Sequence, residues 1–330
     1  ISSRNSEVIP SGIYYEPNSL KAKHCIRGRN YLYDYCNRNN IWFNKCGKLV
    51  VSKFHQQEQI EILFKNANDN GIKGIQLIDK KEIEKLEPLV NSDIALKVDC
   101  TGIFSAHDLM SSLYNKSKNF DHDYLFKSRV MSIQKKSSLY TIEIKNYFGE
   151  TEQLDCNWVI NSSGLDSDII GNLIGLNIPR LKFLKGSYFK LSSKWRGKFK
   201  HLVYPLPDKK HGSLGIHLTI DADQMARLGP NAEWVEDRTE NYNIDESLVT
   251  EFYEEGSKYI KNLKLDDITP EYAGIRPKIL LNGNSMPDFY IQHEDGKGFP
   301  GFINLIGIES PGLTACLSIG ESVSNILIEN

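Results

Sequence analysis

The feature that most constrains the fold of this chain is a unit that occurs twice, in which a short apolar strand, a turn of small residues and an amphipathic helix follow one another. The first unit joins strand 158–161 to helix 169–176 through two serines and a glycine. The second joins strand 302–308 to helix 313–328 through the sequence Glu-Ser-Pro-Gly. A hydrophobic period that changes from that of a strand to that of a helix across such a turn indicates an α/β unit.

The segments between these units alternate in polarity and indicate antiparallel pairing. Residues 129–134 and 139–145 are typical of a meander, and residues 182–235 alternate across many turns. Separate α/β and antiparallel regions in one chain predict an α+β fold rather than a purely doubly wound one. Further helices are expected at 19–40, 55–70, 80–86, 107–118 and 246–263, and further strands at 48–52 and 75–78.

Composition excludes several classes of protein. The formal net charge of -2 over 330 residues does not suit a protein that coats nucleic acid or an anionic membrane. The six cysteines include no CxxC pair, so the spacing suggests neither a zinc site nor a redox-active pair, and we expect free thiols in a reducing compartment. No apolar run approaches the roughly 20 residues of a transmembrane helix.

The turns of the two units are candidate cofactor contacts. Gly164 can adopt a positive φ, which allows close approach of the backbone to a ligand. Pro311 and Gly312 open the last helix, whose first N–H groups have no helical partner and favour an anion. Turns of this kind also occur in many α/β proteins that bind no ligand, so the pattern leaves both interpretations open.

A literal GxGxxG string at 296–301 is not interpreted as a dinucleotide-binding loop. The dinucleotide motif follows a strand and opens a helix, whereas this string precedes the strand at 302–308 and contains Pro300.

Eight strings, in order and over nearly the whole chain, resemble the L-2-hydroxyglutarate dehydrogenase family, within the D-amino-acid-oxidase-like flavoproteins. The strings are Asn5–Ile9 running into Ser11–Tyr15, Ser19–Lys23, Cys46–Leu49, Lys185–Phe189, Leu214–Thr219, Gly229–Trp234, Gly274–Lys278 and Gly307–Thr314.

The resemblance implies FAD as cofactor and a Rossmann-like FAD-binding domain interleaved with an antiparallel substrate domain. Ile1 aligns just after the family's strand, GxGxxG loop and helix, so we expect that segment to be missing from this sequence. The expected FAD-binding domain comprises 1–41, 127–176 and 273–330, and the expected substrate domain 42–126 and 177–272. The expected flavin contacts are Asn5, Ser6, Val130, Ser163, Gly164, Leu165, Gly307, Ser310, Pro311, Gly312, Leu313 and Thr314.

The resemblance also ranks the candidates for substrate chemistry. His217, expected in a strand, is the candidate base because histidine accepts a proton near neutral pH. Arg276 is the candidate for the substrate carboxylate, since its planar fork can bind both oxygens. Lys278 is a weaker second cation, and Tyr15 and Tyr188 are candidates for orienting the substrate. Structural roles in packing or ion pairing are the alternative for each residue.

One position departs from the family pattern. Pro10 stands where the family has a histidine thought to lie near flavin and substrate. Proline carries no proton-transfer group, so either another residue takes the proton or the activity is altered.

The expected function is oxidation of an L-2-hydroxy acid, most specifically L-2-hydroxyglutarate to 2-oxoglutarate, by hydride transfer to flavin. The alternatives are an amine oxidase of the same fold, acting on glycine- or sarcosine-like substrates, and a flavin-free remnant. The resemblance implies a quinone or respiratory-chain electron acceptor. The expected location is the cytoplasm, with peripheral attachment to the inner membrane as an alternative, in mitochondria if the source is eukaryotic.

Overall fold

The computed structural model describes residues 1–207, 214–236, 238, 240–281, 284–285 and 288–329. The chain forms two compact units, each assembled from separate stretches of sequence. Unit 1 comprises Ile1–Met110, Leu184–Ile275 and Pro311–Ile319, and unit 2 comprises Ser111–Phe183, Arg276–Ser310 and Gly320–Asn330. The mixture of helix with parallel and antiparallel strands confirms the predicted α+β class, while the assignment of segments to cofactor and substrate domains stays a prediction.

The largest sheet has the strand order β17-β16-β11-β14-β13-β12-β3-β5-β4, with β15 paired to β11. Most of its strand pairs are antiparallel, and β12 runs parallel to β3. The strands are β3 (Lys48–Ser52), β4 (Ile75–Asp79), β5 (Ile94–Val98), β11 (Leu181–Leu191), β12 (Leu202–Pro205), β13 (Leu218–Ile220), β14 (Ala226–Leu228), β15 (Glu233–Val235), β16 (Ile268–Leu281) and β17 (Asn284–Ser285).

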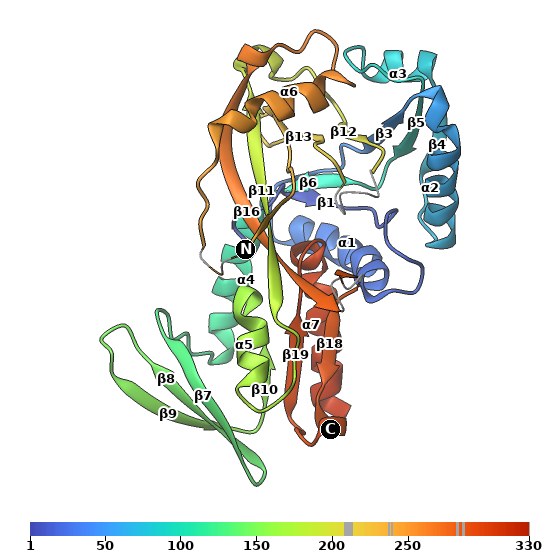
Figure 1. The fold of residues 1–330 in the computed structure, drawn as a ribbon. Helices are drawn as coiled ribbons and strands as arrows, with labels where there is room; N and C mark the ends of the chain where they lie inside the picture. Colours follow the sequence, from blue (N-terminus) through green and yellow to red (C-terminus); the bar gives the residue numbers. More distant parts are fainter. Residues whose placement is uncertain (208–213, 237, 239, 282–283, 286–287, 330) are drawn as a thin grey trace. The chain divides into compact units, whose positions relative to one another are not determined.

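Three smaller sheets complete the strand content. They have the orders β1-β6-β2, β7-β8-β9 and β10-β19-β18. The predicted meander is the antiparallel sheet β7-β8-β9 (Figure 1). The strands are β1 (Val8–Ile9), β2 (Phe43–Asn44), β6 (Gly102–Phe104), β7 (Arg129–Lys136), β8 (Leu139–Lys145), β9 (Thr151–Cys156), β10 (Val159–Asn161), β18 (Tyr290–His293) and β19 (Phe302–Ile306).

The helices follow the predicted pattern, with corrections at their ends. The Ser19 hydroxyl caps α1 by accepting from the Ala22 N–H at 3.1 Å, as expected. In unit 1, α2 lies against β4 and β5 (Figure 1). The helices are α1 (Leu20–Arg38), α2 (Gln57–Asp69), α3 (Lys80–Leu86), α4 (Ala106–Ser117), α5 (Ser167–Asn172), α6 (Val249–Ser257) and α7 (Gly312–Glu329).

Two helices end earlier than their apolar periodicity predicts. The helix expected at 246–263 is α-helical only over α6, because the chain beyond it pairs with another loop: the Asn91 N–H donates to the Tyr259 carbonyl at 2.8 Å. The helix expected at 169–176 ends at Asn172, whose side chain bonds to both backbone groups of Ile178. Contacts with residues outside the helix therefore decide where each one stops.

The large sheet has one face in the core of unit 1 and another that carries polar groups. Phe189 of β11 packs on Phe252 of α6, with ring centroids 4.2 Å apart. Because neighbouring side chains of a strand point to opposite faces, Tyr188 faces away from this contact. The α6 side of the sheet thus supplies hydrophobic stability, and the opposite side carries the polar side chains.

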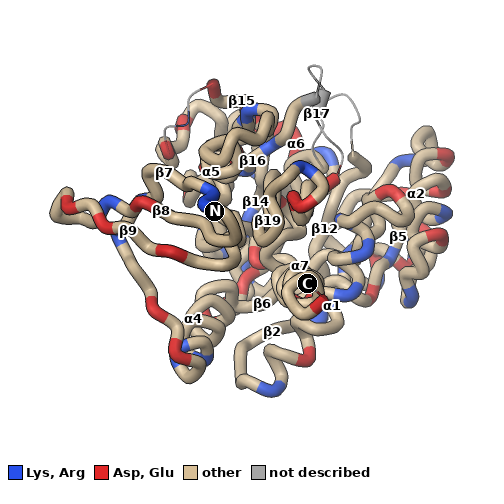
Figure 2. The backbone as a smooth tube through the Cα atoms, turned by 90° about the horizontal axis from the view of Figure 1, so that it is seen from below, with Lys and Arg blue, Asp and Glu red and all other residues tan. Residues whose placement is uncertain are grey.

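Charged residues of both signs are spread over the elements of the chain. Figure 2 shows charges of both signs along α2, which carries Glu58, Glu61, Lys65 and Asp69. Of the helices in the described ranges, none has the length and apolar composition required to cross a bilayer.

A glycine in α1 allows this helix to press against the start of α7 within unit 1. A Cβ at Gly28 would lie 2.6 Å from the Ala315 Cα and 2.8 Å from the Thr314 carbonyl oxygen. Both neighbours are backbone atoms, which cannot yield without moving a helix. Gly28 therefore fixes the position of the first turn of α7.

We predict that Gly28→Ala lowers the free energy of unfolding by about 1–3 kcal/mol, the usual cost of overpacking. Gly320→Ala is the matched control, since Gly320 is also helical, is exposed and has no atom within 4 Å of its Cβ position. The control should be neutral or more stable by up to roughly 1 kcal/mol, through helix propensity. Urea denaturation of both variants tests this, and equal effects would contradict the close approach of α1 to α7.

Candidate active site

Strand register places several of the candidate residues in one row across the large sheet. Val203 pairs with Leu218, so Tyr204 lies opposite His217. Phe189 pairs with Leu228, so Tyr188 lies opposite Gly229, the residue whose N–H donates to the His217 carbonyl at 2.9 Å. Cross-strand partners project from the same face. Tyr204, His217 and Tyr188 therefore lie on the face opposite the α6 contact, and we call it the tyrosine face.

The tyrosine face is built from stacked rings. Tyr204 stacks on His217 with centroids 3.8 Å apart and planes 19° apart. Tyr188 stacks on Tyr272 of β16 at 4.5 Å and also 19°. Burial, with smaller contributions from neighbouring phenols such as Tyr14 and Tyr188, raises the pKa of Tyr204 well above its usual value. Burial also raises the pKa of Tyr272, so the Tyr204 and Tyr272 hydroxyls stay protonated at physiological pH and can act as hydrogen-bond donors.

His217 is held in one tautomer. The residue lies immediately before β13 rather than inside a strand, which corrects the expectation from sequence, and it is 5% exposed. Its Nδ1 lies 2.9 Å from the Gly215 carbonyl oxygen. Since a carbonyl only accepts, Nδ1 carries the proton and Nε2 is the basic nitrogen of the neutral ring.

Lys48 is a member of this site that sequence reasoning missed. Lys48 pairs with Leu202, and Tyr204 lies two residues further along β12, so Lys48 and Tyr204 share a face. Its amine lies 4.4 Å from the Tyr14 ring centroid, 4.6 Å from that of Tyr204 and 3.5 Å from the Tyr14 hydroxyl. Burial lowers the pKa of Lys48 to about 7. The available signal was a lysine opening an otherwise apolar strand.

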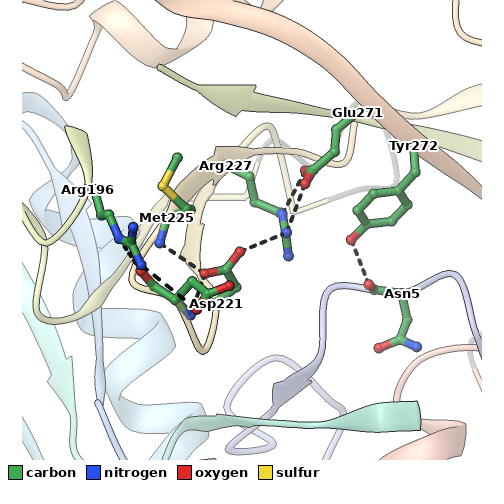
Figure 3. Close-up of polar contacts among 8 residues, drawn as sticks. Asn5, Arg196, Asp221, Met225, Arg227, Glu271 and Tyr272 are labelled. Carbon is green, nitrogen blue, oxygen red and sulfur yellow. Dashed lines mark hydrogen bonds and ion pairs between the residues drawn. The ribbon is translucent and has the colours of Figure 1, made fainter. Parts of the chain in front are cut away.

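The loop that contains Asn5 is tied to the tyrosine face through Tyr272. The Tyr272 hydroxyl donates to the Asn5 carbonyl at 2.7 Å (Figure 3). The Asn5 Oδ1 accepts from the Glu7 N–H, also at 2.7 Å. The Arg227 guanidinium lies 5.5 Å from the Tyr272 ring centroid. Asn5 is thus fixed by its backbone and by its side chain, and Ser6 follows it in the same partly buried loop.

Arg227 holds this side of the sheet together. Its guanidinium bonds both carboxylate oxygens of Glu271, at 2.9 and 3.0 Å, and reaches the Asp221 carboxylate at 3.2 Å (Figure 3). The Arg227 side chain is 11% exposed. Planar, two-point recognition of a carboxylate is specific to arginine, so the pair fixes β14 against the segment of β16 that carries Tyr272.

We predict that Arg227→Lys lowers the free energy of unfolding by about 1–2 kcal/mol, because lysine cannot reproduce the two parallel bonds. The matched control is Arg196→Lys, whose guanidinium is 60% exposed and 3.9 Å from the Asp223 carboxylate. An exposed pair of this kind contributes roughly 0–1 kcal/mol. Thermal and urea unfolding would compare the two, and a null effect of Arg227→Lys would refute the structural role of the fork.

In unit 2, the two predicted strand–turn units meet at one edge. β10 and β19 are parallel neighbours, with Asn161 opposite Asn304, and the two side chains share a hydrogen bond of 2.7 Å. The turns that follow these strands therefore leave the same edge of the sheet. Gly164 and Gly307 occupy the left-handed region, with φ of +62° and +66°. Ligands of open α/β sheets bind outside the carboxyl ends of such strands.

Packing and hydrogen bonds shape both turns of unit 2. A Cβ at Gly307 would lie 2.9 Å from Ile279 Cγ1, so only glycine fits there without a shift. The Ser163 hydroxyl donates to Asn161 Oδ1 at 2.6 Å. Leu165 is partly buried, and Ser310 is exposed.

The start of α7, in unit 1, offers free backbone donors. The first helical bond runs from the Ala315 N–H to the Pro311 carbonyl at 2.9 Å, which leaves the N–H groups of Gly312, Leu313 and Thr314 outside the helical ladder. The Thr314 hydroxyl caps back onto the Pro311 carbonyl.

The remaining candidates have distinct surroundings. Arg276 and Lys278 lie on β16 in unit 2, both partly buried, and the Lys278 ammonium is paired with the buried Glu309 carboxylate in the turn after β19. Val130 lies partly buried in β7. The Tyr15 carbonyl accepts hydrogen bonds from the side-chain amides of Asn66 in α2 and of Asn70, which follows the helix.

Pro10, in unit 1, directly follows β1. It is partly buried, and its carbonyl accepts from the Cys25 thiol at 3.5 Å.

Comparison with known proteins identifies the relatives of this chain. The family described as FAD dependent oxidoreductase matches residues 1–326. The mitochondrial L-2-hydroxyglutarate dehydrogenase of Arabidopsis thaliana is 36% identical over 98% of this chain and 75% of the relative. The mitochondrial L-2-hydroxyglutarate dehydrogenase of Homo sapiens is 30% identical over 97% of this chain and 78% of the relative.

Solved structures share the fold at lower identity. The dithionite-reduced, FAD-bound L-α-glycerophosphate oxidase of Mycoplasma pneumoniae superposes with a TM-score of 0.87 at 24% identity, covering 99% of this chain and 84% of that one. The glycine oxidase of Geobacillus kaustophilus gives a TM-score of 0.79 at 15% identity, covering 100% and 85%.

Proposed function

The chain belongs to the L-2-hydroxyglutarate dehydrogenase family of FAD-dependent oxidoreductases, and we propose from this that it oxidises L-2-hydroxyglutarate to 2-oxoglutarate. The observation that carries the proposal is the identity of 36% to a named L-2-hydroxyglutarate dehydrogenase over almost the whole chain. The tyrosine face supports it, because it collects buried donors and a basic histidine on one rigid sheet.

The described residues fit the family's FAD cofactor. Two turns whose glycines have positive φ leave the same end of a parallel strand pair, the place where open α/β sheets bind their ligands. We propose that the residues holding FAD are Ser163, Gly164 and Leu165 in one turn and Gly307 and Ser310 in the other. The free amides of Gly312, Leu313 and Thr314, with Pro311 shaping their turn, are proposed to face negative charge on the cofactor. Asn5, Ser6 and Val130 are further proposed contacts. When bound, FAD supplies the hydride acceptor.

The proposed proton acceptor is His217 at Nε2. Oxidation of the Cα–OH group breaks the O–H bond, and a positioned imidazole accelerates such a step by about 10²–10⁴-fold. The Gly215 carbonyl holds the Nδ1–H and so keeps Nε2 basic. Arg276 is proposed to bind the carboxylate next to the reacting carbon, and Tyr15 and Tyr188 to orient the substrate through their hydroxyls.

Lys278 is a less suitable substrate cation than its sequence position implied. Its ammonium already pairs with Glu309, and a substrate carboxylate would have to compete with that buried partner. We propose instead that this ion pair fixes the turn after β19.

An amine oxidase of the same fold is the second candidate, and the structural similarity to a glycine oxidase keeps it testable. That similarity, at 15% identity, concerns the fold alone. The sequences Gly-Ile-Arg-Pro and Gly-Ile-His-Leu-Thr, which contain Arg276 and His217, favour the hydroxy acid.

We further propose a quinone or another respiratory-chain component as electron acceptor, and a mitochondrial location with peripheral attachment at the inner membrane. The location is proposed because the relatives from Arabidopsis thaliana and Homo sapiens are mitochondrial. The electron acceptor is proposed from the family resemblance.

The experiment is anaerobic reduction of the flavin. The full-length protein, reconstituted with FAD, is mixed with L-2-hydroxyglutarate, D-2-hydroxyglutarate or sarcosine, and the absorbance of oxidised flavin is followed. We expect bleaching with the L isomer alone. Bleaching by sarcosine alone would favour the amine oxidase, and a protein that binds no FAD would leave the flavin-free remnant as the correct interpretation.

The same assay tests His217. In His217→Gln, FAD content and L-isomer binding should persist while the first-order bleaching rate falls by about 10²–10⁴-fold. An unchanged rate would exclude His217 as the proton acceptor.

A further inference from the structure

Lys48 is a buried amine that has no carboxylate partner among the described residues. It is 3% exposed. Its amine contacts two tyrosine rings and one tyrosine hydroxyl, from Tyr14 and Tyr204, and the thiols of Cys25 and Cys100 are the nearby titratable groups that act on it. Buried charges in proteins are normally paired. An amine on a rigid central strand without such a partner is therefore placed where an incoming anion can supply one.

The surroundings of Lys48 suit an ammonium that meets an anion. Two electron-rich ring faces within 5 Å stabilise the cation without neutralising it. The Tyr14 hydroxyl, 3.5 Å from the amine, can donate to the same anion. Tyr14 is only partly buried, so its ring lies between the buried amine and the solvent-accessible part of this loop.

The Thr219 hydroxyl, a second buried polar group, lies in the same cross-strand row as Lys48. Lys48 pairs with Leu202, and Leu202 lies opposite Thr219, because Val203 pairs with Leu218. The Thr219 hydroxyl is fully buried, and among the described residues it has no hydrogen-bond partner. Its side chain shares the tyrosine face with His217, two residues before it. A buried hydroxyl without a hydrogen-bond partner and a buried amine without a carboxylate partner, both on one face, suit a ligand with several oxygen atoms.

The proposed substrate has such a shape. 2-Hydroxyglutarate carries one carboxylate beside the reacting carbon and a second one at the far end of the chain. Arg276 is already proposed for the first, and Lys278 is bound by Glu309. Within the described ranges, Lys48 has no competing carboxylate.

We propose that Lys48 binds the distal carboxylate of the substrate and makes the protein selective for dicarboxylates over monocarboxylates. This inference rests on the proposed function. Binding would pair the carboxylate with the ammonium and let the Tyr14 hydroxyl donate to the same carboxylate. No bond of the substrate changes in this step, which consists of ion pairing and, above neutral pH, uptake of one proton by the amine.

The test compares ligands that differ only in the distal group. Binding of 2-oxoglutarate and of pyruvate to the FAD-loaded protein is measured by the perturbation of the flavin spectrum, with Lys48→Met against the control Lys53→Met. Lys53 lies just beyond the same strand, and its amine bonds Asn91 at the surface. We expect Lys48→Met to weaken 2-oxoglutarate by about 30-fold or more, the effect of a charge-assisted pair, and pyruvate by less than about threefold. The control should change neither.

Proton uptake gives a readout that does not depend on a variant. Burial holds the pKa of free Lys48 at about 7, and a bound carboxylate raises it. Above pH 7 the unmodified protein should therefore take up close to one proton per 2-oxoglutarate, and its affinity should fall about tenfold per pH unit. Calorimetry in buffers of different ionisation enthalpy measures the uptake.

The outcomes separate this inference from the proposed function. Equal loss of both ligands in Lys48→Met, or no proton uptake by the unmodified protein, overturns the distal-carboxylate site. If L-2-hydroxyglutarate fails to reduce the flavin but the selectivity for 2-oxoglutarate depends on Lys48, the site stands and the proposed reaction fails. If the flavin is reduced and Lys48→Met binds both ligands normally, the reaction stands and the inference fails.

Discussion

The candidate site depends on one constraint: the Lys48 amine is buried in the sheet and, among the described residues, has no carboxylate partner. Transfer of an ammonium from water into a protein interior costs several kcal/mol unless other groups compensate. Here the compensation comes from tyrosine faces at 4.4 and 4.6 Å. One ring belongs to β12, which pairs with β3, and the other to the loop after β1. The strand register and this loop are therefore parts of the site as well as of the fold.

The loop owes its path to backbone geometry. Gly12 has φ of +98°, and a Cβ there would lie 3.1 Å from Ile26 of α1. After this turn the Tyr14 ring lies 4.4 Å from the Lys48 amine, and the turn itself packs against α1 at Ile26. The same helix allows α7 to approach closely at Gly28, where a Cβ would meet the backbone of Ala315. Within unit 1, one helix thus sets both the aromatic cover of the amine and the position of the free amides at the start of α7.

Much of this arrangement could be predicted from the sequence, because it depends on local signals. Ser19 caps α1, β19 runs through a Pro-Gly turn into α7, and the glycine-rich string at 296–301 precedes a strand, as its context indicated. The ends of α5 and α6 could not be predicted, since distant loops bond to the chain there. Lys48 was missed for the same reason: its partners come from residue 14 and residue 204, and only strand register reveals that they share a face. The predicted roles of His217 and Arg276 depend on the family resemblance and stay proposals.

The fold alone does not choose the chemistry. Structures that superpose on this chain include a glycerophosphate oxidase and a glycine oxidase, at 24% and 15% identity. Side chains rather than the fold must therefore select the substrate, and we propose that those on the tyrosine face do so. We propose that burial lowers the pKa of the Lys48 amine to about 7 and that a bound anion raises it. Titration of the Lys48 side chain tests this most directly. Carbon-13 labelling of the lysine ε position, with Lys48→Met to assign the signal, would follow the amine by NMR. The account predicts a midpoint at about pH 7 that moves upward when 2-oxoglutarate binds. An ordinary lysine midpoint above roughly pH 10, unchanged by the ligand, would contradict it.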